Sequence, residues 1–272
     1  MLADITLGQY YPTESPIHKM DAAVKIMLTL AYMILIFFIK GFVGFLVVGI
    51  FLAFILVLSR IPVSFVFKGL KPIFVFLMLT VILNMFFTGG RKAFTFLWWD
   101  VTYEGIFNSA FMGIRIIFLV IGSTFLTYTT TPIMLTDGIE RILKPFVKVG
   151  VPAYELAMMM SISLRFIPTL IDETDKIMKA QKARGADFES GSIIKRGKAL
   201  IPVLVPLFVS AFRRADELAV AMESRCYNGG SNRTRLNETK PSMLDFYATL
   251  IFVLFFIAAF VPAILNFEIR GF

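Results

Sequence analysis

Two arginines occupy equivalent places in the sequence, each at the end of a stretch with helical periodicity. They lie in the tripeptides Ala183-Arg184-Gly185 and Ser224-Arg225-Cys226. A cation in the last turn of a helix interacts favourably with the helix dipole, by about 0.3–1 kcal/mol, which would explain one terminal arginine. A guanidinium also presents five donors in a rigid fork that matches the carboxylates and carbonyls of a partner protein. Because the arrangement occurs twice, we expect both arginines to dock into grooves on soluble partners.

The residues needed for catalysis or for a metal site are largely missing. The sequence has one histidine, His18, and one cysteine, Cys226, with no histidine nearby that could activate the thiol. No G-x-x-x-x-G-K-[ST] loop is present to hold ATP phosphates, and neither H-E-x-x-H nor G-x-S-x-G occurs. We therefore expect a chain that is not an enzyme and holds no cofactor or metal itself.

The composition is typical of a membrane protein. The chain has 272 residues, of which 57% are hydrophobic and 17% charged, and it includes 30 Phe and 14 Met. Soluble domains have about 45–50% apolar and about 25% charged residues, so an ordinary soluble enzyme is excluded. The net charge of +8 would suit nucleic acid or an anionic membrane surface. The hydropathy favours the membrane, and we expect contact with lipid and none with nucleic acid.

Five stretches are apolar and long enough to approach the roughly 20 residues of a transmembrane helix. They are residues 24–39, 42–58, 72–87, 105–128 and 246–265. Two further stretches, 156–171 and 199–212, are interrupted by an arginine or by prolines. If both of these crossed the bilayer, a strongly basic segment between them would lie outside, against the positive-inside rule. We therefore predict a multi-pass protein of the cell membrane, with five spans and a cytoplasmic N-terminus.

Between the fourth and fifth spans, the apolar pattern changes to that of amphipathic helices. The pattern predicts a short helix over 133–144, a long helix after Pro152 that ends at Gly185, and a second long helix that ends at Arg225. The predicted fold is an all-α integral membrane protein with a cytoplasmic region of long helices. Its parts are residues 1–132 with four spans, the helical region 133–242, and residues 243–272 with the last span.

The sequence resembles the EcfT family, which includes CbiQ and supplies the transmembrane coupling subunit of energy-coupling factor (ECF) vitamin transporters. The resemblance covers nearly the whole chain and depends on residues 163–188 and 213–227, with further similarity at 15–25, 229–230 and 233–235. The first motif, Ala183-Arg184-Gly185, has the family's commonest form. The second motif has Cys226 where glycine is usual, so that Asn228 or Gly229 could provide the left-handed residue of the cap instead.

The resemblance implies a complex with two ABC ATPase subunits and a substrate-binding S component. In that family, the two arginine motifs dock into the ATPases, which bind ATP and magnesium, and the coupling helices carry the motion to the S component. An S component that moves would need an adaptable apolar surface, for which methionine is suited. The sequence offers Met158, Met159, Met160 and Met178 for this role, although the same residues could pack against lipid or a neighbouring helix.

Two other functions remain open at this point. A conventional permease with its own substrate path would need polar residues inside the bilayer, and Arg115 is the only hint of one. Arg115 is better explained by a structural partner, either Asn84 or a backbone carbonyl. An intramembrane enzyme would need paired acids, or serine with histidine, within the spans, and the sequence provides neither.

Overall fold

The computed structural model describes residues 9–39, 41–96, 99–188, 190, 192–227 and 242–264. Contacts divide these residues into two compact units. The bundle unit contains the described residues of 8–138 and 239–272, and the insert unit contains those of 139–238. The insert unit is therefore a continuous segment placed between two parts of the bundle unit.

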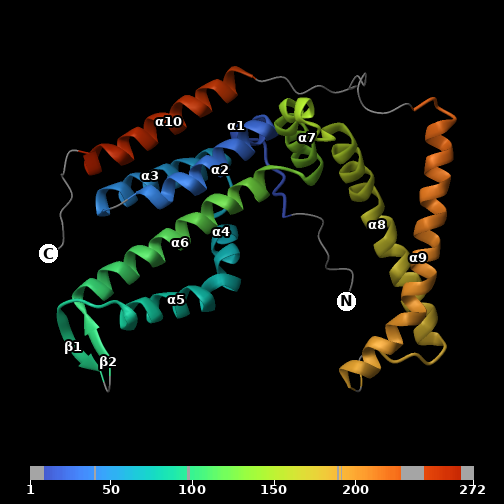
Figure 1. The fold of residues 1–272 in the computed structure, drawn as a ribbon, viewed down its shortest axis with the longest axis horizontal. Coiled ribbons are helices and arrows are strands. Elements are labelled where there is room, and N and C mark those ends of the chain that lie inside the picture. Colours follow the sequence, from blue (N-terminus) through green and yellow to red (C-terminus); the bar gives the residue numbers. More distant parts are fainter. Residues whose placement is uncertain are drawn as a thin grey trace. The chain divides into compact units, whose positions relative to one another are not determined.

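The bundle unit is built mainly from helices. They are α1 (Pro16–Lys19), α2 (Ala22–Phe38), α3 (Phe42–Ser59), α4 (Val63–Leu70), α5 (Phe74–Phe87), α6 (Tyr103–Thr129) and α10 (Met243–Ile264). A 3₁₀ turn at Lys71–Ile73 joins α4 to α5, and Figure 1 shows the chain turning sharply there. α7 (Pro132–Leu143) begins in the bundle unit and ends in the insert unit.

The long helices of the bundle pack side by side around α6 (Figure 1). α5 and α2 lie against α6, and α10 lies against α3. Aromatic residues fill the core, with Phe51 of α3 meeting Phe252 and Phe256 of α10 at ring distances of 5.9 and 6.1 Å. Apolar side chains also cover much of the outer surface, as expected when the surrounding solvent is lipid hydrocarbon.

Five segments of the described chain are long and apolar enough to cross a membrane. They are Phe42–Ser59, Val63–Phe87, Tyr103–Thr129, Ala153–Ala183 and Met243–Val261. The sequence also predicted five spans. Four of the predicted spans match four of these segments, but the fifth differs. The predicted span 24–39 corresponds to α2, which has 17 residues, and α8 (Ala153–Ala183) qualifies instead through its apolar first half. The chain is a multi-pass membrane protein with a predominantly helical fold, as predicted.

A β-hairpin was not predicted. β1 (Lys92–Phe96) pairs antiparallel with β2 (Trp99–Thr102) in the connection between α5 and α6. The sequence analysis assigned no element between the spans 72–87 and 105–128, because two strands of five and four residues give little periodic signal. At the hairpin's end, Thr102 begins α6 by accepting a hydrogen bond from the Gly105 N–H at 3.0 Å.

Arg115 has a structural role inside the bundle. Its Nη2 donates to the carbonyl oxygen of Ile39, the residue that ends α2, at 3.0 Å. The guanidinium also lies 5.6 Å from the centre of the Phe45 ring. Asn84, the alternative partner, instead donates to Thr80 within its own helix. The prediction of a backbone carbonyl as partner is therefore confirmed.

A second buried cation forms what we call the polar junction, made of His18, Asp21, Lys25, Thr129 and Asp245. The Lys25 ammonium donates to the carbonyl oxygens of Thr129 at 2.9 Å and His18 at 3.2 Å, and it lies 3.5 Å from Thr130 Oγ1. An Asp245 carboxylate oxygen accepts from the Asp21 N–H at 2.9 Å. The junction thus ties α2 to the end of α6 and to the start of α10.

The junction lies near the two positions in the sequence where the chain leaves and re-enters the bundle unit. α6 ends at Thr129, just before α7, and α10 begins at Met243, just after the insert. His18 is buried in the junction, where its ring bonds to Ser15 Oγ at 2.7 Å and the Tyr11 carbonyl at 3.1 Å. Burial lowers the pKa of His18 below its usual value, which favours the uncharged ring.

Because Lys25 is the cation of the polar junction, we expect its replacement by a nonpolar residue to lower the stability of the chain strongly. Lys25→Met should lower the free energy of unfolding by about 2–4 kcal/mol, because it leaves buried carbonyls and carboxylates without their cation. Thermal unfolding of the purified chain in detergent would measure this. Lys19→Met is the control, because the Lys19 side chain is 68% exposed and should tolerate the change. Equal stability of the two variants would contradict the role of the junction.

Candidate docking site

The insert unit presents its two arginine motifs on a pair of long helices. α8 (Ala153–Ala183) and α9 (Ile193–Glu223) cross each other, as Figure 1 shows. Arg214 of α9 forms an ion pair with Glu173 of α8 at 3.0 Å, and the Gln181 amide lies 3.5 Å from the Pro202 carbonyl. These two contacts run in opposite directions along the helices, so α8 and α9 are antiparallel.

α8 ends in a Schellman motif, in which backbone N–H groups bond to the last carbonyls of the helix. The Ala186 N–H donates to Gln181 O at 3.0 Å, and the Gly185 N–H donates to Lys182 O at 3.0 Å. Gly185 has a φ of +88°, which is the left-handed conformation predicted for it. Arg184 is the capping residue of this motif.

α9 ends in the same motif with Cys226 in the place of glycine. The Tyr227 N–H donates to Met222 O at 3.0 Å, and the Cys226 N–H donates to Glu223 O at 2.9 Å. Cys226 has a φ of +58°, so it supplies the left-handed residue itself. Asn228 and Gly229, which the sequence offered as alternatives, lie outside the described residues. Arg225 therefore occupies the position that Arg184 has in the first motif.

Both motifs are open to solvent. Ala183, Arg184, Gly185, Ser224, Arg225 and Cys226 are all exposed. Within the described part of the chain, neither guanidinium has a hydrogen bond or an ion pair, so all their donors are available to a partner. The hydrogen-bond requirements of the helix ends are met by backbone N–H groups instead.

The two arginines lie at opposite ends of the helix pair, because the helices are antiparallel (Figure 1). Arg184 is close in sequence to Gln181, which meets α9 at Pro202. At 1.5 Å per residue, Arg225 lies about 35 Å further along α9 from that contact. The motifs are therefore too far apart to form one combined site.

The charges around the two arginines differ. Three exposed basic residues, Lys195, Arg196 and Lys198, follow Arg184 in the first turns of α9. The turns before Arg225 carry Asp216, Glu217 and Glu223. A partner groove that fits the first arginine would therefore meet a more basic surface than a groove that fits the second.

The four methionines proposed for contact with the S component do not form one exposed face. Met159 is 54% exposed, whereas Met158, Met160 and Met178 are only partly exposed. A larger apolar surface lies on α9, where the exposed side chains are Ile201, Leu204, Val205, Phe208, Val209 and Phe212. The sequence analysis predicted an amphipathic helix here, ending at Arg225. It missed the extent of the exposed face, because helical periodicity does not show which stripe is covered.

The described residues contain no group of three or more His, Cys, Asp or Glu side chains that could hold a metal ion. The carboxylates in the polar junction bond to backbone N–H groups of Asp21, Ala23 and Ser242. Their arrangement suits a structural network in which each acid has a fixed donor.

Comparison with known proteins identifies the family. The profile of the family CbiQ, described as a cobalt transport protein, matches residues 13–236. A protein of Clostridium kluyveri is 55% identical over 92% of this chain and 93% of its own length. Proteins of Thermosediminibacter oceani and Bacillus subtilis are 50% and 44% identical, covering 91% and 86% of this chain and 93% and 89% of their own lengths. All three are named energy-coupling factor transporter transmembrane protein EcfT.

The chain belongs to the EcfT/CbiQ family. The resemblance inferred from the two arginine motifs is confirmed, and the chain is a transmembrane component of an ECF transporter. The family is non-catalytic, in agreement with the missing enzyme motifs. Because the relatives align over most of their length, the similarity includes both the bundle unit and the insert unit.

Because the backbone of Cys226 is in the left-handed conformation, we expect glycine at this position to stabilise the end of α9. A left-handed conformation costs a residue with a side chain roughly 1–2 kcal/mol, and glycine avoids this cost. Cys226→Gly should therefore stabilise the cap by about 1 kcal/mol and slow amide exchange there roughly fivefold. Hydrogen–deuterium exchange of the peptide around Met222 and Tyr227 would measure this.

Ser224→Gly is the matched control, because Ser224 has a φ of −63° and gains nothing from glycine. This variant should exchange as fast as the wild type or faster. If both glycine variants slowed exchange equally, the left-handed assignment of Cys226 would be wrong.

Proposed function

We propose that this chain couples two ABC ATPase subunits to a substrate-binding S component in an ECF importer of vitamins or other micronutrients. Arg184 and Arg225 dock into one ATPase each, and the ATPases bind ATP and magnesium. Closure of the ATPase pair moves α8 and α9, which pass the motion to the S component. The observation that supports this most directly is the repeated cap, which holds an exposed and unpaired arginine at the same position of two helix ends.

The cap geometry suits a force-bearing contact. In each motif, the arginine is fixed by backbone hydrogen bonds on both sides, so the base of its side chain moves with the helix. The Arg214–Glu173 ion pair and the crossing of α8 with α9 link the two helices to each other. A displacement applied to one tip would therefore reach the partner helix. Within the insert unit, Met159 and the exposed apolar face of α9 are surfaces available for the S component.

We propose that the N-terminus and the insert unit are cytoplasmic. The basic residues around Arg184 favour this orientation by the positive-inside rule, and docking to ATPases requires it. In this arrangement α2, α3, α5, α6 and α10 cross the membrane. α8 remains outside the hydrocarbon core, because charges from Asp172 to Lys182 fill its second half. A permease with its own substrate path finds no support in Arg115, whose guanidinium is bonded to the end of α2.

Charge reversal at both arginines should release the ATPases. Buried arginine contacts commonly contribute about 2–4 kcal/mol to an interface, so each of Arg184→Glu and Arg225→Glu should weaken binding roughly 30- to 1000-fold. The double variant should then lose ATPase subunits during affinity purification, while remaining folded in the membrane. Co-purification followed by quantitative immunoblotting would measure the loss.

The matched control reverses two exposed cations on the same helices but away from the tips. Lys176→Glu with Arg213→Glu makes the same change in net charge and should keep the ATPases bound. If the double tip variant retained its ATPases as well as this control does, the docking role of both arginines would be refuted. The single variants show whether one tip binds more strongly.

The proposed orientation can be tested with the chain's only cysteine. Cys226 is exposed and lies within the second motif. A membrane-impermeant maleimide should not label Cys226 in intact cells, and it should label it after permeabilisation. The control is Gly89→Cys in a Cys226→Ser background, because Gly89 is exposed just after α5 and, in the proposed arrangement, would lie on the opposite side of the membrane. Labelling of Cys226 from outside would reverse the topology and exclude ATPase docking.

A further inference from the structure

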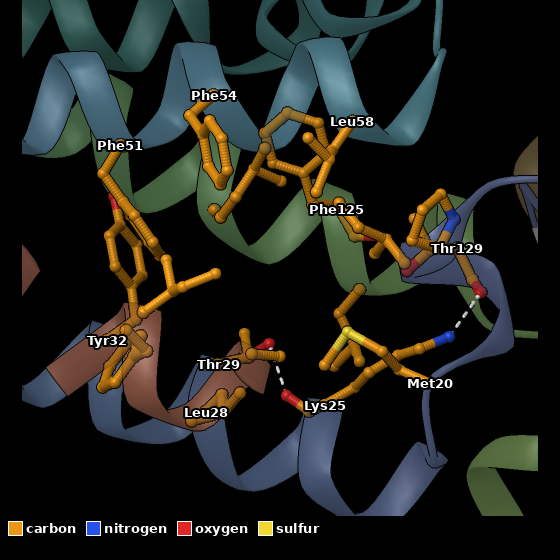
Figure 2. Close-up of a pocket in the computed structure, with 18 of the residues that line it drawn as sticks. Met20, Lys25, Leu28, Thr29, Tyr32, Phe51, Phe54, Leu58, Phe125 and Thr129 are labelled. Carbon is orange, nitrogen blue, oxygen red and sulfur yellow. Dashed lines mark hydrogen bonds between the residues drawn. The ribbon is translucent and has the colours of Figure 1, made fainter. Parts of the chain in front are cut away.

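A cavity of about 260 Å³ lies within the bundle unit beside the polar junction, as Figure 2 shows. Its walls come from α1, α2, α3, α6 and α10. Leu28 of α2, Leu58 of α3 and Phe125 of α6 are among the apolar side chains that face it (Figure 2). Thus the cavity lies among packed helices of the membrane-spanning part of the chain.

The polar side chains in the inner wall have no hydrogen left to donate to a ligand. The ammonium of Lys25 has its three oxygen contacts in the junction. The hydroxyls of the inner wall are bonded to backbone carbonyls at 2.7–2.8 Å, in the pairs Thr29 with Lys25, Tyr32 with Phe118, and Thr129 with Phe125. The inner wall therefore offers no free donor with which to recognise a polar molecule, although it could accommodate a hydrocarbon.

The more exposed wall residues mark the open side of the cavity. Phe54 of α3 is 38% exposed and Tyr247 of α10 is 59% exposed. Tyrosine is enriched where membrane proteins meet the bilayer interface, since its ring and hydroxyl suit the boundary between hydrocarbon and water. The position of Tyr247, one turn from the start of α10, thus suits an opening near the membrane surface.

We propose that one acyl chain of a membrane phospholipid occupies this cavity. An empty apolar cavity destabilises a protein in proportion to its volume, and an engineered cavity of about 150 Å³ already binds benzene. The present cavity is larger, and the solvent around the bundle unit is itself acyl chain. The occupant fills the space between α2, α3 and α10 next to Thr129, where α6 leads towards the insert unit.

The experiment uses a phosphatidylglycerol with a diazirine in one acyl chain, mixed into vesicles of phosphatidylethanolamine and phosphatidylglycerol that contain the full chain. Light should attach the lipid to the wall residues Ile55 and Leu126, and also to Leu254, which is 57% exposed on the outside of α10. Peptide mapping by mass spectrometry locates each label. A label on Leu254 with none on Ile55 or Leu126 would overturn the proposal.

Filling the cavity should remove the inner labels only. Ala248→Leu on α10 places a larger side chain in the wall, so labels on Ile55 and Leu126 should be lost while that on Leu254 remains. The matched control is Ala258→Leu, on an exposed part of the same helix, which should keep all three labels. If Ala248→Leu fails to insert, Thr29→Leu fills the space from α2 instead.

Two further outcomes would contradict the acyl chain. Inner labels that persist in the filled variant would show that they come from surface lipid. Labelling of Ile55 and Leu126 by a small water-soluble diazirine, at the level seen with the lipid probe, would show that the cavity holds water. All labelled positions lie in the bundle unit, so the test is independent of the proposed docking of Arg184 and Arg225.

Discussion

The structure depends on how each helix end satisfies its last carbonyl groups. The final carbonyls of an α-helix have no partner within the helix, and within a membrane there is no water to supply one. At the ends of α2 and α6 in the bundle unit, cationic side chains meet this need. Arg115 donates to the carbonyl of Ile39 at the end of α2, and Lys25 donates to the carbonyl of Thr129 at the end of α6. Each cation is stabilised in turn by the negative end of a helix dipole.

The same requirement is met differently at the tips of the insert unit. The Schellman motifs of α8 and α9 use backbone N–H groups to satisfy the last carbonyls. Arg184 and Arg225 are at helix ends, as the two buried cations are, but their guanidiniums are not needed there. A cation that caps a helix is a structural residue, whereas a cation on a helix that is already capped is available to a partner. This difference explains why Arg115 and Lys25 have a structural role, whereas Arg184 and Arg225 are available to partners.

The sequence predicted those features that depend on local pattern. Gly185 follows a run of periodic residues and basic side chains, and its left-handed conformation was predictable because glycine adopts it at little cost. Cys226 gave no such signal, since a cysteine is expected to avoid that conformation. The second cap became evident only from the hydrogen bonds of Cys226 and Tyr227. The sequence thus predicted that both arginines lie at helix ends. It did not predict that both ends have the same capping hydrogen bonds.

Features that depend on distant contacts were beyond the sequence. Lys25 is more than 100 residues from Thr129 and more than 200 from Asp245, and no periodicity relates them. Arg115 is an intermediate case. Its position within a span predicted that the charge must have a partner, because an unpaired charge there is costly, but the sequence did not identify Ile39 as that partner. The antiparallel pairing of α8 and α9 likewise follows from contacts such as Arg214 with Glu173. Because that pairing separates Arg184 from Arg225, the helix pair presents two distant arginines. Under the proposed function each would hold one ATPase subunit, so that a change in the distance between those subunits would have to rotate or bend the pair.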